Sequence, residues 1–265
     1  MEAERVDGSA IAILAVGGIV AGISAGVLGI GGGVLLVPLL VTAGASPTEA
    51  VGTSTLAIVL TATSGSIQNW RAGNLDWRKV LILGIPALIT AQLGALLAEA
   101  VPSFVLLAGF GCLLLVNIAL MGLRQNLVKL DAPPMRSPSI FETLTPRLST
   151  GGAAGLLAGL FGVGGGVIMV PLQMLWLQEP IKRAIQTSLG VIVLTAISAC
   201  LAHARQDNVL WIAGLILGTG GLVGAQLGAR FLPKLPDANV KIIFRTVLIV
   251  LSIYTFWRAW RAFGG

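Results

Sequence analysis

The chain has 265 residues, of which 55% are hydrophobic and only 11% are charged, and it carries a formal net charge of +6. So few charged residues cannot cover the surface of a water-soluble protein of this length. The composition therefore indicates a surface that faces lipid. The positive charge does not indicate a nucleic-acid partner, because the lysines and arginines sit at the ends of apolar runs, where they act as topology signals.

Several apolar runs approach or exceed the roughly 18 to 20 residues that a helix needs to cross a bilayer. Backbone groups in lipid must be bonded within the protein, which predicts helices, and the runs lack the alternation of membrane β-strands. We therefore expect an all-helical, multi-pass protein of the cell membrane. The runs cover residues 9–28, 50–67, 80–101, 104–123, 184–201, 209–231 and 240–257.

The two cysteines indicate no metal or redox site, and the N-terminus does not read as a cleaved signal peptide. Cys112 and Cys200 lie inside apolar runs without the CxxC spacing of a metal or redox site, so we interpret both as small hydrophobic residues. No metal and no cofactor are expected. The first residues, MEAERVDG, lack the positively charged region of a cleaved signal peptide, so the first apolar run is expected to stay in the mature protein.

The two halves of the chain repeat one another. The stretch GISAGVLGIGGGVLLVPLL from Gly22 returns as GLLAGLFGVGGGVIMVPLQ from Gly155. TSTLAIVLTATS from Thr53 likewise corresponds to TSLGVIVLTAIS from Thr187, and the pentapeptide AQLGA occurs in both halves. A repeat of half the chain is too long for a solenoid period and is typical of the duplicated halves of secondary transporters.

The repeat and the polar segments predict the domain organisation. We expect a polar N-terminal tail at 1–8, a first transmembrane repeat at 9–123, a cytoplasmic linker at 124–148 and a second repeat at 149–262. Each half holds one glycine-broken segment and three spanning helices, or about eight membrane segments in all. If each broken segment returns to the face that it entered, the halves are inverted. The positive-inside rule favours inversion over parallel halves, which stay open as the alternative.

Each repeat contains a cluster of glycines, GIGGG from Gly29 and GVGGG from Gly162. Each glycine destabilises a helix by up to about 1 kcal/mol relative to alanine, so three adjacent glycines predict a break. The apolar piece after each break starts a half-helix whose free N–H groups and positive dipole end favour an anion. We therefore predict substrate-binding backbone at Gly29, Gly31, Gly32, Gly33, Gly162, Gly164, Gly165 and Gly166.

The alternative is that these glycines only allow close helix packing. We accept that interpretation for glycines with small-xxx-small spacing elsewhere in the chain. These are Gly18, Gly22, Gly26, Gly220, Gly224 and Gly228.

Neutral polar residues recur at matching places in both halves. Hydroxyls can donate to an anion without adding negative charge, although buried hydroxyls also bond to carbonyls of their own helix. A side-chain amide in the middle of a spanning helix needs a partner, either the substrate or a neighbouring helix. The predicted substrate contacts are Thr53, Ser54, Gln92, Thr187, Ser188 and Gln226.

Asn69 and His203 occupy matching positions, each two residues before an arginine. Because a cationic rim attracts anions, we predict a gating or anion-attracting rim formed by Asn69, Arg71, His203 and Arg205. An ordinary interfacial anchor is the alternative for the arginines. His203 is the only histidine of the chain, and a role in proton transfer is a further hypothesis.

Acidic residues are absent from the interiors of the uninterrupted apolar runs. Cation transporters usually need buried carboxylates, so their absence favours an anionic substrate. The segment GISAG matches the GxSxG pattern of a serine hydrolase at Ser24, but the second repeat has Leu157 there and no base partner is evident. An intramembrane serine hydrolase is therefore only a remote alternative, and no ATP-binding motif is present.

The duplicated GxGGG motif, the Val-Pro that follows it and the Thr-Ser of the next helix resemble the TauE/SafE family of membrane permeases, the sulfite exporter family. The resemblance covers residues 11–257 and places the family's glycine motif on the eight glycines named above. It implies export or exchange of a small sulfur-containing anion, such as sulfite, sulfoacetate or a similar organosulfonate, across the cytoplasmic membrane.

Further expectations concern energy and assembly. Export of an anion from a cell that is negative inside is favourable by about 2.3 kcal/mol per charge per 100 mV, so the membrane potential suffices and proton coupling is not required. An anion channel with the same residues is the main alternative. The expected partners are the small anion and membrane lipid, a homodimer being left open.

Overall fold

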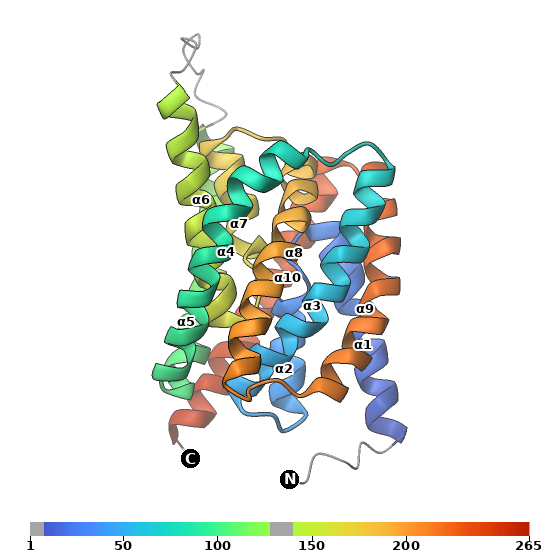
Figure 1. The fold of residues 1–265 in the computed structure, drawn as a ribbon, viewed down its shortest axis with the longest axis vertical. Helices are drawn as coiled ribbons and strands as arrows, with labels where there is room; N and C mark the ends of the chain where they lie inside the picture. The colour runs from blue at the N-terminus through green and yellow to red at the C-terminus, as the bar shows by residue number, and fades with distance from the viewer. Residues whose placement is uncertain (1–7, 128–139, 265) are drawn as a thin grey trace.

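The computed structural model describes residues 8–127 and 140–264, which form helices joined by short connections (Figure 1). Six helices of this part are long and apolar enough to cross a membrane. The expectation of a helical multi-pass membrane protein is confirmed. Residues 1–7 of the expected N-terminal tail and residues 128–139 of the expected linker lie outside the described residues.

The helices follow the same order in both halves. The first half contains α1 (Gly8–Leu28), α2 (Gly33–Thr42), α3 (Pro47–Arg71), α4 (Trp77–Ala100) and α5 (Ser103–Leu127). The second half contains α6 (Ile140–Phe161), α7 (Gly166–Trp176), α8 (Ile181–Arg205), α9 (Trp211–Phe231), the short 3-10 turn η1 (Leu232–Lys234) and α10 (Asp237–Gly264). Helix α6 begins inside the stretch expected to be linker, because a helix can continue past the apolar residues that mark its membrane part.

Local signals begin the long helices. The Ser46 hydroxyl accepts from the Glu49 amide at 3.2 Å, and the Glu49 carboxylate accepts from the Ser46 amide at 2.9 Å. This capping box, with Pro47 in the first turn, starts α3. The Asp76 carboxylate caps α4 by accepting from two amides of its first turn.

Helices α3 and α8 end in the same kind of turn. The amide of Asn74 donates to the carbonyl of Asn69 at 2.9 Å, and the amide of Asn208 donates to the carbonyl of His203 at 3.0 Å. The residue before each asparagine has a positive φ. This six-residue closing bond is that of a Schellman turn, so Asn69 and His203 have equivalent backbone positions in the two halves.

Figure 1 shows the directions of the helices. Helix α1 begins and α10 ends at one end of the molecule, here called the terminal end, whereas α5 ends and α6 begins at the opposite end, the linker end. Helix α3 runs from the terminal end to the linker end, and α8 runs the opposite way. The α2–α3 connection lies at the terminal end, and the α7–α8 connection lies at the linker end.

Close packing joins the two halves. Helix α1 packs along α9, and α4 packs along α6, while α3 and α8 contact each other in the centre. A Cβ atom on Gly22 would lie 2.2 Å from the carbonyl oxygen of Gly221. Comparable approaches occur at the other glycines with small-xxx-small spacing, so their packing role is confirmed.

Candidate functional site

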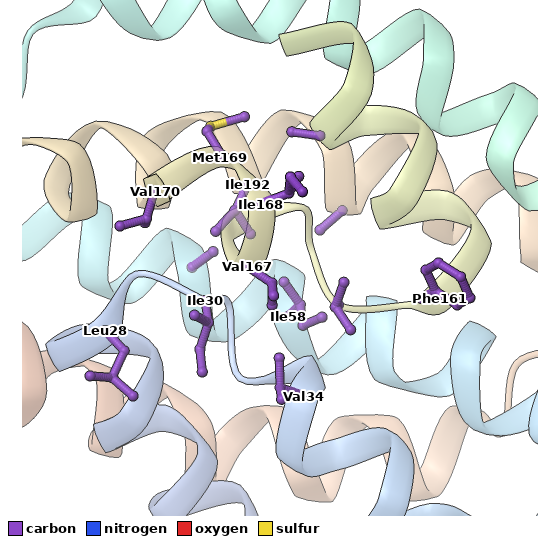
Figure 2. Close-up of a cluster of buried hydrophobic side chains, with 14 of the residues drawn as sticks. Leu28, Ile30, Val34, Ile58, Phe161, Val167, Ile168, Met169, Val170 and Ile192 are labelled. Atoms are coloured by element: carbon purple, nitrogen blue, oxygen red, sulfur yellow. The ribbon is translucent and has the colours of Figure 1, made fainter. Parts of the chain in front are cut away.

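The two glycine breaks meet in the core of the molecule (Figure 2). A Cβ atom on Gly33 would lie 2.2 Å from the carbonyl oxygen of Gly162, and one on Gly166 would lie 2.0 Å from the carbonyl oxygen of Gly29. Each half-helix therefore starts against the break of the other half. Only glycine permits this reciprocal approach of two backbones.

The backbone at the breaks is left-handed. Gly32 and Gly165 are the residues directly before α2 and α7. Positive φ is costly for side chains with a Cβ atom, which explains the glycine clusters. The predicted helix breaks are confirmed by φ values between 64° and 83° at Gly29, Gly31, Gly32, Gly162, Gly164 and Gly165.

The breaks leave backbone amides without acceptors. In the first half, the amides of Leu35 and Leu36 donate to the carbonyl of Gly32, but the amides of residues 30–34 make no hydrogen bond in the described structure. In the second half, the amide of Met169 donates to the carbonyl of Gly165, and the amides of residues 163–168 make none. Two half-helix N-termini thus present unpaired donors at the same place.

Apolar side chains surround these donors. Ile30, Val34, Ile58, Val167 and Ile192 are all 0% exposed and gather around the breaks in Figure 2. Among the described residues, no aspartate, glutamate, lysine or arginine is buried. Helix dipoles act more strongly in such a low-dielectric surrounding than they do in water.

Of the four predicted hydroxyls, one reaches the breaks. The Ser54 hydroxyl lies 2.8 Å from the carbonyl oxygen of Gly162. The Thr53 hydroxyl instead accepts from the amide of Leu210 at 2.9 Å. The Ser188 hydroxyl accepts from Gln173 Nε2 at 2.9 Å. Thr187, which precedes Ser188, is buried and makes no hydrogen bond in the described structure.

A hydroxyl that sequence reasoning missed also contacts a break. The Thr195 hydroxyl donates to the carbonyl of Gly164 at 3.2 Å. Its repeat partner Thr61 bonds within its own helix, to the carbonyl of Ala57. The signal was available, because both threonines stand eight residues after the first threonine of the repeated Thr-Ser pair.

The two repeated glutamines do not meet at the breaks. Gln92 Nε2 donates to the carbonyl of Ser198 at 3.2 Å and so ties α4 to α8. Gln226 is exposed on α9 and makes no hydrogen bond in the described structure. Gln92 therefore acts between helices, and Gln226 is not brought to the other predicted residues.

The expected rim is divided between surface and core. Arg71 and Arg205 are exposed at the ends of α3 and α8. Asn69 and His203 are 1% and 0% exposed, so they lie in the core and are separated from the exposed arginines. Both residues lie two positions before the end of their helix and are buried, whereas the arginines are the last helical residues and are exposed.

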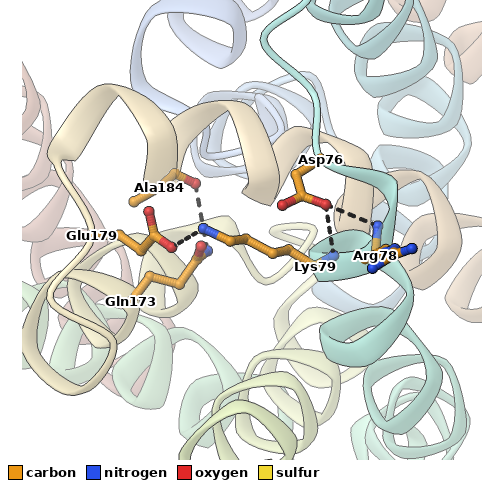
Figure 3. A network of polar contacts seen from close by, with 6 residues as sticks. All are labelled: Asp76, Arg78, Lys79, Gln173, Glu179 and Ala184. Atoms are coloured by element: carbon orange, nitrogen blue, oxygen red, sulfur yellow. Dashed lines mark hydrogen bonds and ion pairs between the residues drawn. The ribbon is translucent and has the colours of Figure 1, made fainter. Parts of the chain in front are cut away.

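A polar network at the linker end was also missed (Figure 3). Lys79, in the first turn of α4, forms an ion pair with Glu179 in the α7–α8 connection. Next to it, Gln173 Nε2 contacts the carbonyl of Ala184 and the Ser188 hydroxyl. These contacts join the start of α4 to the end of α7 and the start of α8.

Ser24 lies inside the continuous helix α1. The nucleophile elbow of GxSxG hydrolases requires a sharp turn between a strand and a helix. The structure therefore offers Ser24 none of the geometry that the remote hydrolase alternative needs.

Comparison with known proteins agrees with this architecture. The sequence profile of the sulfite exporter TauE/SafE family matches residues 14–255. The probable membrane transporter protein YunE of Bacillus subtilis is 30% identical, over 91% of this chain and 95% of that protein. A probable membrane transporter protein of Xylella fastidiosa (strain Temecula1) is also 30% identical, over 95% and 97%.

A more distant relative, the probable membrane transporter protein MJ0441 of Methanocaldococcus jannaschii, is 26% identical over 91% of this chain and 94% of its own. No solved structure matches the chain significantly. Because the family match spans both glycine breaks and nearly all of the helices, this chain belongs to the TauE/SafE sulfite exporter family, whose relatives are named as membrane transporters.

Proposed function

We propose that this protein is a secondary transporter that carries a small anion across the cytoplasmic membrane and binds it at the two glycine breaks. The observation that carries the proposal is the meeting of two half-helix N-termini, with unpaired amides at residues 30–34 and 163–168. Amides and dipoles at helix N-termini favour anions. Transporters of other folds use discontinuous helices in the same way.

The surroundings of the breaks support a compact oxyanion. The buried polar side chains of the described residues are hydroxyls, amides and one imidazole, without lysine or arginine. Polyphosphates are usually held by arginine, lysine or a metal ion. Sulfite, sulfoacetate or another small organosulfonate fits the neutral donors, and the family description supports a sulfur-containing substrate.

We further propose that the halves are inverted repeats with about eight membrane segments and that they work by alternating access. The opposite directions of α3 and α8 support inversion, as do the connections of α2 and α7 at opposite ends. The glycines of both breaks are buried, so an anion can enter or leave only after the helices around them move. The linker end is then cytoplasmic by the positive-inside rule.

Flux into liposomes tests the substrate assignment. Purified protein would be reconstituted and assayed with sulfite, methanesulfonate, sulfoacetate, sulfate, taurine and lactate, beside protein-free liposomes. We expect sulfite or a compact sulfonate to be transported best. Preference for a solute without net negative charge, such as taurine, contradicts an anion site.

The same preparation distinguishes a carrier from an anion channel. A carrier that alternates between two open states shows accelerated exchange when unlabelled substrate is present on the far side. A channel instead conducts single-channel currents. We expect trans-stimulation. Single-channel currents without trans-stimulation would show that the protein is a channel of the same architecture.

A further inference from the structure

Two buried polar side chains at equivalent places in the two halves have atoms without a hydrogen-bond partner. Asn69 is 1% exposed and His203 is 0% exposed. The side-chain atoms Nδ2 and Oδ1 of Asn69 and the Nδ1 atom of His203 lack a hydrogen-bond partner. Burying such groups unpaired costs roughly 1 to 3 kcal/mol each, so a protein that keeps them at both repeat positions has a use for them.

The two side chains lie toward opposite ends of the molecule. Asn69 belongs to the last turns of α3, near the linker end, and His203 to the last turns of α8, near the terminal end. Both helices also line the glycine breaks, through Ile58 and Ile192. The breaks therefore lie between Asn69 and His203 along the length of the molecule.

His203 is connected to the helix that leads into the second break. Its Nε2 atom lies 3.0 Å from the carbonyl oxygen of Gly159, one turn before Gly162 on α6. On another side, a Cβ atom on Gly52 of α3 would lie 3.1 Å from His203 Cβ. His203 therefore contacts α6 through its imidazole and packs against α3 through its Cβ atom.

The contact with Gly159 determines which ring nitrogen carries the hydrogen. A carbonyl oxygen only accepts, so Nε2 must donate to it. In the neutral ring, Nδ1 then has a free lone pair and no donor nearby. Protonation of this lone pair leaves the Gly159 bond intact and converts the ring to an imidazolium.

Few charged side chains lie near the His203 imidazole. Glu99, near the end of α4, interacts electrostatically with the imidazole. Glu49 of α3 is engaged in its own capping box, and Arg205 and Asp207, on the same helix and its following turn, are exposed. On α6, residues 149–161 include no charged side chain.

Resting on the proposed function, we infer that His203 binds a proton at Nδ1 together with the transported anion, and that Asn69 is its uncharged counterpart on the other side. An imidazolium in an apolar core is unstable alone, and a nearby anion stabilises it. The same linkage strengthens anion binding when the ring is protonated. A monovalent anion then crosses with one proton and no net charge, which departs from export driven by the membrane potential.

Flux measurements with His203→Gln test this coupling. Glutamine keeps a donor nitrogen for the Gly159 carbonyl but does not titrate. Methanesulfonate is the probe, because its charge is constant between pH 5 and 8, where histidine changes charge. For the unaltered protein we expect flux to fall about tenfold over that range, to carry protons detected by an internal pH dye, and to ignore an imposed potassium–valinomycin potential.

His203→Gln is expected to lose the pH dependence and the proton movement, and its flux should follow the imposed potential. The matched control is Asn69→Ala at the equivalent position. Whatever its rate, this variant is expected to keep the pH profile of the unaltered protein. The inference is overturned if flux of the unaltered protein carries no protons, or if His203→Gln keeps the pH profile of the unaltered protein.

A second measurement does not depend on transport. Because His203 is the only histidine, its ring is the only imidazole signal in an NMR titration of the histidine-labelled chain in detergent. We expect methanesulfonate to shift the titration midpoint upward. If the anion binds and the titration midpoint does not shift, the inference is overturned. If the anion is nevertheless transported, the proposed function remains intact. Absence of both binding and flux for every anion contradicts the proposed function itself.

Discussion

At the residue scale, the glycines of the breaks have two separable properties, a left-handed backbone and a contact with the opposite half. Gly31 has φ 74° and its Cβ atom would lie 3.2 Å from Ile192 Cγ2. Gly73, in the α3–α4 turn, has φ 71°, but nothing lies within 4 Å of its Cβ position. The pair therefore separates backbone strain from a role at the crossing.

We predict that Gly31→Ala lowers anion flux about tenfold or more, whereas Gly73→Ala leaves it near the original rate. Both variants should lose a similar roughly 1 to 2 kcal/mol of stability from left-handed strain. Flux in liposomes and thermal unfolding in detergent measure the two effects. Equal flux in both variants would show that the crossing glycines only pack helices.

At the scale of the elements, the linker end carries an ion pair that the terminal end lacks among the described residues. Lys79 and Glu179 are 29% and 14% exposed and connect α4 with the α7–α8 connection. Lys182 and Asp237, 3.3 Å apart, form a more exposed pair, with Asp237 53% exposed. Solvent screens the second pair more strongly than the first.

We predict that a double-mutant cycle of Lys79→Met and Glu179→Gln gives a coupling of about 1 kcal/mol or less, still larger than the cycle of Lys182→Met and Asp237→Asn. Thermal unfolding in detergent supplies the four stabilities of each cycle. Equal couplings would mean that Lys79 and Glu179 hold α4 no more firmly than an exposed pair does.

At the scale of the whole molecule, the ends of α3 and α8 report the relation between the halves. Asn74 follows α3 at the linker end, and Asp207 follows α8 at the terminal end. Parallel repeats would place these two equivalent turns on the same side of the membrane. Inverted repeats place them on opposite sides.

We predict that a membrane-impermeant maleimide labels Asp207→Cys in intact cells but labels Asn74→Cys only after lysis, because the proposed orientation, based on the positive-inside rule, places the linker end in the cytoplasm. Cys112 is exposed and Cys200 is buried, so both are first replaced by alanine. Labelling of both positions in intact cells would establish parallel halves. Labelling of Asn74→Cys alone in intact cells would show the opposite orientation, with the linker end outside.

The sequence by itself determined the class of the protein, the helices and the two breaks. Apolar length specifies a membrane helix, and the three consecutive glycines Gly31 to Gly33 weaken one, because both effects depend on neighbours along the chain. The internal repeat likewise predicted that corresponding elements recur, as the matching turns after α3 and α8 confirm.

Only the tertiary structure decided what these elements do to each other. Ser54 reaches a break while its repeat partner Ser188 is held by Gln173, and Gln92 is bonded between helices while Gln226 is exposed. The repeated letters are the same, but the partners across the helix contacts differ between the halves. Burial and hydrogen bonding depend on those partners, so no pattern within one segment of the sequence specifies them.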